Sequence, residues 1–133
     1  MKISDLMIGD WVLHEGTHKK VTVVWDDAIS LYNPQKTWGS IYYDKYYDAI
    51  EPVPLTPEIL ERNGFREYAK DAYAFSCHKQ MAGDGFELQS VVIRNMKALE
   101  VSTADADLRT SMKYVHQLQH ALRLCGIDKK IEL

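Results

Sequence analysis

The stretch 114-YVHQLQHALRLCG-126 contains the clearest helical pattern in this chain and decides how its second half is expected to fold. Successive helical residues lie about 100° apart, so this spacing separates an apolar arc from a polar one. The apolar arc comprises Tyr114, Val115, Leu118, Ala121, Leu122 and Cys125, and the polar arc comprises His116, Gln119, His120 and Arg123. Gly126 can adopt the left-handed conformation that ends a helix. We therefore predict an amphipathic helix with one buried and one solvated face, after which residues 131–133 could form a short strand.

A shorter helix is predicted upstream from the residues that mark its two ends. Thr56 is a good N-cap, and Pro57 suits the first helical position. Leu55 and Leu60 have the spacing of a hydrophobic staple across this start. The sequence Asn63-Gly64-Phe65 then provides a stop, with Gly64 at the left-handed position. These signals limit the helix to the residues between Thr56 and Asn63.

Three strands are predicted between the two helices. Residues 72–77 are rich in aromatic and small apolar side chains, and residues 86–93 and 97–101 form a hairpin around Arg94-Asn95. Residues 78–85 are expected to be a flexible connection, and residues 102–111 a polar loop. The second half, residues 56–133, is therefore expected to be a small α+β subdomain with a helix, three strands and a second helix.

The first half, residues 1–55, reads as antiparallel strands joined by tight turns. Strands are expected at residues 11–13, 21–25 and 28–32, and the prolines at 52 and 54 keep residues 51–54 extended. The lead-in 8-IGDWV-12, followed by such a meander, resembles the start of SH3-like barrels. The predicted fold class is α+β: an SH3-like antiparallel β-meander or barrel that packs on the second subdomain as one compact unit.

An aromatic segment spans residues 36–50, and we expect it to supply the surface that contacts a partner. Its rings are Trp38, Tyr42, Tyr43, Tyr46 and Tyr47. The spacing fits either a strand or a helical turn, and the alternative role is to fill the space between the two halves. Nucleic acid is not favoured as the partner, because residues 42–48 carry one Lys against two Asp. A protein partner is the better interpretation.

Charge and cysteine content narrow the class of protein. The net charge of -3 gives no general attraction to phosphate backbones. Asp5 and Asp10 interrupt the first apolar residues, so no secretory signal is predicted, and no run is long enough to span a membrane. Cys77 and Cys125 are far apart and form no disulfide framework. These features predict a reduced, cytoplasmic protein without membrane contact.

A catalytic metal site is not predicted, although His116 and His120 are spaced to reach one ion from one helical face. A zinc protease requires Glu at position 117, where Gln cannot accept a proton, and Arg123 would repel a cation. We expect both histidines to be solvated, and adventitious metal binding is the most that the pair supports. Cys77 and His78 are adjacent at the end of a predicted strand, and neighbouring residues of an extended chain point to opposite faces. We predict no catalytic residues and no cofactor.

Two segments carry a resemblance to a known group of proteins. The sequences 51-EPVPLTPEILERNGF-65 and 114-YVHQLQH-120 resemble small uncharacterised proteins of gut Bacteroidales and of their phages and mobile elements. That group has no established activity, so the resemblance implies a phage or mobile-element context and no catalytic residues. The expected function is a small, non-enzymatic binding or accessory protein that acts through a protein partner, for example on host factors. The alternatives are a nucleic-acid-binding module and a small metal-dependent enzyme.

Overall fold

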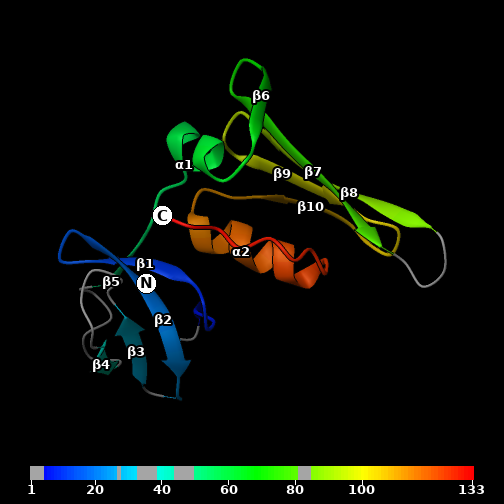
Figure 1. Ribbon diagram of the computed structural model, residues 1–133. Coiled ribbons are helices and arrows are strands. Elements are labelled where there is room, and N and C mark those ends of the chain that lie inside the picture. The colour runs from blue at the N-terminus through cyan, green and yellow to red at the C-terminus, as the bar shows by residue number, and fades with distance from the viewer. Residues whose placement is uncertain (1–4, 27, 33–38, 44–49, 81–84) are drawn as a thin grey trace. The chain divides into compact units, whose positions relative to one another are not determined.

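The computed structural model describes residues 5–26, 28–32, 39–43, 50–80 and 85–133 (Figure 1). The chain divides into two compact units, one comprising Met1–Pro54 with Tyr114–His116 and the other comprising Leu55–Lys113 with Gln117–Leu133. Each unit contains an antiparallel sheet. In the element order, one helix follows the strands of the first sheet and the other follows those of the second. The predicted α+β class is therefore confirmed.

The first unit contains a five-stranded sheet with the order β4-β3-β2-β1-β5. Its strands are β1 (Trp11–His14), β2 (Thr17–Val24), β3 (Ala28–Tyr32), β4 (Gly39–Tyr43) and β5 (Ile50–Pro52). The turn between β1 and β2 has positive φ at both Glu15 and Gly16, as a two-residue hairpin turn of type I′ requires. The three strands predicted for residues 11–32 are confirmed.

The core of the first sheet is a compact apolar cluster, with Val24 packed against it. Its buried members are Leu6, Val12, Val21, Ile29, Leu31 and Ile50. These residues come from β1, β2, β3 and β5 and from the segment before β1, so the cluster ties the strands together. Within the described strands the two edges, β4 and β5, do not pair. The sheet does not close, and the predicted barrel is not confirmed.

The second unit contains a meander with the order β10-β9-β8-β7-β6. Its strands are β6 (Arg66–Ala69), β7 (Ala72–Gln80), β8 (Phe86–Arg94), β9 (Ala98–Ser102) and β10 (Asp107–Ser111). The predicted hairpin of β8 and β9 is confirmed, and its turn has positive φ at Asn95 and Met96. Its buried side chains alternate along the strands, as a half-buried sheet requires, and include Tyr73, Val91, Ile93, Leu99 and Val101.

Three details of the second unit differ from the sequence prediction. Residues 78–80 continue β7 and are not a flexible connection. β6 and β10 were not predicted, and β10 replaces half of the expected polar loop at residues 102–111. Both are edge strands with mostly exposed side chains. Because neither strand buries one face, their sequences do not alternate apolar and polar residues, which is the pattern that would predict a strand. The unit therefore has five strands where the sequence predicted three.

The first helix, α1 (Pro57–Arg62), begins and ends as predicted. The hydroxyl of Thr56 accepts a hydrogen bond from the amide of Ile59 at 3.3 Å. At the other end the amide of Phe65 donates to the carbonyl of Leu60 at 3.0 Å, and the amide of Gly64 donates to that of Glu61 at 3.2 Å. These two bonds and the positive φ of Gly64 define a Schellman motif.

The second helix, α2 (Val115–Leu124), runs along one face of the second sheet (Figure 1). It also ends in a Schellman motif, in which the amide of Ile127 donates to the carbonyl of Leu122 at 2.9 Å and Gly126 has positive φ. Residues 131–133 are not a strand; the side chain of Asn63 instead binds the main chain of Glu132. Neither helix of the described chain is long and apolar enough to cross a membrane.

The polar arc of α2 is more buried than the sequence predicted. The exposed fraction is only 8% for His116 and 6% for Gln119, whereas Arg123 is exposed. The prediction of a solvated outer face is therefore wrong for these two residues. An amphipathic pattern identifies the apolar side of a helix, but it does not determine whether the polar side is also covered.

Candidate functional site

The aromatic residues predicted to contact a partner lie in the least described part of the chain. Trp38, Tyr46 and Tyr47 fall outside the described residues. Tyr42 and Tyr43 lie in β4, where they pair with Ile29 and Ala28 of β3. Of the two structures that the sequence allowed for the aromatic segment, a strand or a helical turn, residues 39–43 adopt the strand. The role of these rings in partner binding stays a prediction.

The two histidines considered as metal ligands both lie on α2, as their spacing predicts. His116 is buried and its ring stacks on that of Tyr114, with centroids 5.9 Å apart, while His120 is half-buried. Across the described ranges no three His, Cys, Asp or Glu side chains are grouped closely enough to hold a metal ion. The stacking on Tyr114 is an aromatic contact, not metal ligation.

The two cysteines are free thiols that make ordinary packing contacts. The thiol of Cys77 lies 3.4 Å from the side-chain oxygen of Gln89, its cross-strand neighbour on β8. Burial raises the pKa of Cys125, which keeps this thiol protonated at neutral pH. Both cysteines are half-buried.

His14 of β1 is the most clearly perturbed histidine in the first unit. Its ring is buried, and Nδ1 lies 2.8 Å from the ammonium of Lys19 on β2. Burial lowers the pKa of His14 below 6.5, Lys19 lowers it further, and nearby Glu15 opposes the shift. The neutral ring accepts the hydrogen bond, so protonation would break the contact and place two positive charges together.

We expect acidification to destabilise the protein partly through His14. Because its pKa is lower in the folded state, the unfolded chain binds the proton more readily. The stability that neutral His14 contributes is therefore complete above its pKa in the unfolded chain, and it is lost as the pH falls through its pKa in the folded protein. Urea midpoints measured from about pH 8 to about pH 5 should fall less in His14→Gln than in the wild type. His18→Gln, at an exposed position of β2, should keep the wild-type slope, and an equal slope in all three proteins would contradict the assignment.

The best candidate for a functional surface is one face of the second sheet, which we call the charged face. It consists of the side chains opposite the buried row, because alternate residues of a strand point to opposite faces. It comprises Ala74, Ser76, His78, Phe86, Leu88, Ser90, Val92, Arg94, Ala98, Glu100, Ser102, Asp107, Arg109 and Ser111. Glu100 of β9 pairs with Val92 of β8 on one side and with Arg109 of β10 on the other.

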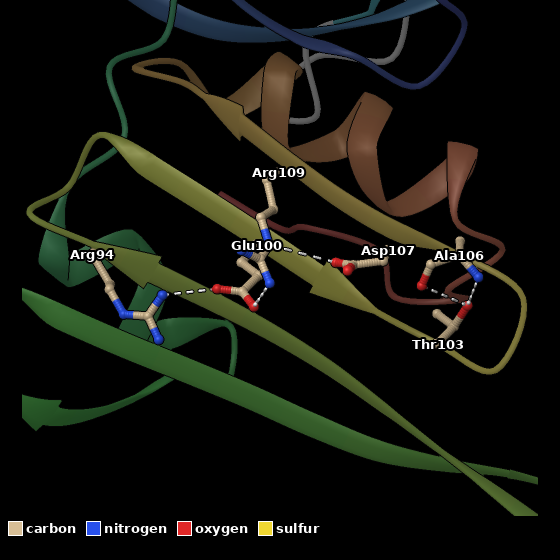
Figure 2. Close-up of polar contacts among 6 residues, drawn as sticks. All are labelled: Arg94, Glu100, Thr103, Ala106, Asp107 and Arg109. Carbon is tan, nitrogen blue, oxygen red and sulfur yellow. Dashed lines mark hydrogen bonds and ion pairs between the residues drawn. The ribbon is translucent and has the colours of Figure 1, made fainter.

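A small ion-pair network occupies one end of the charged face. Figure 2 shows the carboxylate of Glu100 between two guanidinium groups, with Arg94 at 2.8 Å and Arg109 at 3.5 Å. Arg109 also lies 3.8 Å from Asp107 and is 73% exposed, so it is held only loosely. The hydrogen bond from Arg94, with the charge of Arg109, lowers the pKa of Glu100. Glu100 therefore stays ionised, which suits polar recognition and not proton transfer.

The network borders a shallow cavity of about 380 Å³. Its lining is formed by Arg94, Ala98, Leu99, Glu100, Arg109, Thr110 and Ser111. Exposed ion pairs of this kind contribute little to stability, typically less than about 1 kcal/mol, so the network does little to hold the fold together. Its guanidinium groups and hydroxyls are available for recognition.

The other end of the charged face is apolar and lies on a two-stranded ribbon. β9 pairs with β8 only over Ser90–Arg94, whereas β7 continues to pair with β8 as far as Phe86. Beyond β9, the side chains of Phe86 and Leu88 are 68% and 58% exposed. Sequence reasoning missed this pair, because alternate positions on both faces of β8 carry apolar residues. The structure was needed to show that β9 ends opposite Ser90 and that Phe86 and Leu88, beyond this point, are exposed.

The charged face thus combines an apolar ribbon, a central group of serines and an ion-pair network on one antiparallel sheet. Such an arrangement suits contact with another macromolecule more than enclosure of a small substrate, because its cavity is shallow and its apolar groups protrude. Comparison of the chain with protein families, with curated proteins and with solved structures finds no match.

Proposed function

We propose that this chain is a binding protein that acts through a protein partner, and that the charged face of the second sheet is its contact surface. The observation that carries the proposal is the exposure of Phe86 and Leu88 side by side on one face of the ribbon. Removing exposed apolar surface from water favours association. Protein interfaces combine such an apolar centre with a polar rim, and the network around Glu100 would supply part of that rim.

The first unit is proposed to have an SH3-like architecture. Two observations support this finer assignment. β5 returns to pair with β1, so the last strand of the unit lies beside the first. The register of β2 and β3 shifts between Val21 and Val23, and such bulges bend strands in curled sheets. A second contact surface at Tyr42, Tyr43 and the neighbouring aromatic residues would belong to this unit.

A cytoplasmic location, a non-enzymatic role and a phage or mobile-element context complete the proposal. They rest on the cysteine content and on the resemblance of residues 51–65 and 114–120 to Bacteroidales and phage proteins. Under this proposal the partner is a protein of the bacterial host, and binding alone is the activity.

The proposal is tested by affinity capture from a bacterial host lysate with the wild type and with Phe86→Ser/Leu88→Ser. Loss of two apolar side chains that the partner would cover should weaken partner binding at least tenfold, because such anchors dominate interface energies. The melting temperature should stay close to that of the wild type, since both side chains are exposed. Leu124→Ser, a matched change at another exposed apolar position, should bind normally.

Two further samples separate the alternatives. A partner lost only in Tyr43→Ala/Tyr47→Ala would move the contact surface to the aromatic segment of the first unit. Nuclease treatment of the lysate should leave the captured partner unchanged. Recovery that disappears with nuclease would contradict a protein partner and favour nucleic-acid binding.

A further inference from the structure

β10 forms one edge of the second sheet, and its side chains are mostly exposed. Only β9 pairs with it among the described strands, through the register Leu108↔Val101 and Arg109↔Glu100. An edge strand presents main-chain groups on its outer side that can pair with another strand. β10 therefore offers a template for one more strand.

The hydrogen-bond phase of β10 identifies the residues that face outward. Beyond each end of the ladder, the amide of Thr103 donates to the carbonyl of Ala106 at 2.8 Å and that of Met112 donates to Lys97 at 2.7 Å. Hydrogen-bonded pairs alternate with non-hydrogen-bonded pairs along an antiparallel ladder. Leu108 and Thr110 consequently bond to β9, whereas the N–H and C=O groups of residues 107, 109 and 111 point away from the sheet.

We infer that β10 pairs antiparallel with β10 of a second copy of this chain. Asp107 then lies opposite Arg109 of the partner subunit, and Arg109 lies opposite Asp107 of the partner subunit. A two-fold axis perpendicular to the sheet keeps the charged faces of both copies on one side. The outward-facing residues then form the hydrogen-bonded pairs, and Leu108 lies opposite its own counterpart on the other face.

The charges select this register over its neighbours. A shift of the pairing by two residues in one direction places Arg109 opposite Arg109 of the partner subunit. A shift by two residues in the other direction places Asp107 opposite Asp107 of the partner subunit. Like charges directly opposite each other destabilise a strand pair, and opposite charges stabilise it. Of these three registers, only the proposed one pairs opposite charges at both symmetry-related positions without any like pair.

The existing contacts of Arg109 allow it to reach across. Its guanidinium lies 3.5 Å from Glu100 and 3.8 Å from Asp107, and the side chain is 73% exposed. Both are loose surface contacts that a cross-strand carboxylate can replace or extend. A strand without an acidic and a basic residue two positions apart would lack these ion pairs, so the two residues favour a second copy over such strands.

The test is the oligomeric state of charge-reversal variants, measured by sedimentation equilibrium over a wide concentration range at low salt. The wild type should dimerise reversibly. Asp107→Arg and Arg109→Asp each create like-charged pairs and should weaken the dimer roughly tenfold to a hundredfold. When the two variants are mixed, every cross-strand pair is again opposite in sign, so a heterodimer should form. Asp128→Arg, the same charge change at an exposed residue outside β10, should dimerise like the wild type.

Amide hydrogen exchange of the wild type gives an independent measurement that needs no variant. Exchange at Asp107 and Arg109 should slow as the protein concentration rises, while Leu108, already bonded to β9, should not change. A wild type that stays monomeric, unchanged dimerisation of Asp107→Arg, or folded variants that fail to associate on mixing would each overturn the inference.

Discussion

Replacing Asn63 with alanine is expected to lower the free energy of unfolding by about 3 kcal/mol. The side chain is only 5% exposed, and each of its polar atoms is used. Its amide nitrogen donates to the carbonyls of Ile59 and Glu132, both at 2.8 Å, and its oxygen accepts from the amide of Glu132 at 2.8 Å. Alanine would remove both bonds to the main chain of Glu132, whereas the carbonyl of Ile59 would keep its bond from the backbone amide of residue 63 at 3.2 Å. A polar group that folding removes from water and leaves unsatisfied costs about 1–3 kcal/mol.

The loss is measured by urea denaturation and assigned by a double-mutant cycle. Asn63 and Glu132 lie 69 positions apart in the sequence, so deletion of residues 131–133 removes one side of the contact without touching α1. In the truncated chain Asn63→Ala should cost much less than in the full chain, because only the bond to Ile59 remains. Equal losses in both backgrounds would show that Asn63 stabilises the helix end alone.

Gly64→Val is expected to destabilise the second unit by about 2–3 kcal/mol. Gly64 has φ +87°, which a β-branched residue adopts only with strain, and it supplies one of the two Schellman bonds of α1. An added Cβ would meet only the ring of Phe75, at 3.9 Å, so the expected cost comes from the backbone conformation and not from a clash.

Two substitutions calibrate this effect in the same denaturation experiment. Gly64→Ala should cost about 1 kcal/mol, less than valine, because alanine is not β-branched. Gly85→Val should be nearly neutral, since Gly85 does not have positive φ and its Cβ would enter open space. A Gly64→Val protein as stable as the wild type would mean that the Schellman motif opens without loss.

The features that the sequence predicts well are those encoded by a few adjacent residues. Thr56 and Gly64 mark the two ends of α1, and Gly126 marks the end of α2, because caps depend on local hydrogen bonds and on φ. The turns at Gly16 and Asn95 likewise follow from residues that tolerate positive φ. Local chemistry determines these positions whatever the rest of the chain does.

The features that escaped prediction depend on contacts between distant segments. β10 has only one apolar side chain, Leu108, and therefore no apolar alternation, so its pairing with β9 is what identifies it as a strand. The bond between Asn63 and Glu132 and the burial of His116 are likewise set by tertiary structure. The candidate site escaped for the same reason, since Arg94, Glu100 and Arg109 converge from three strands.

The strand orders of the two sheets imply different folding kinetics for the two units. In the second sheet every strand pairs with its neighbour in sequence, so hairpins can add one after another with short loops to close. In the first sheet β5 must return past three intervening strands to pair with β1. Non-local pairing slows folding, because the entropy of loop closure is lost before the contacts form. The β1–β5 pairing is therefore the slow step in assembling the first sheet, while the second sheet can form early as a template for its own helix.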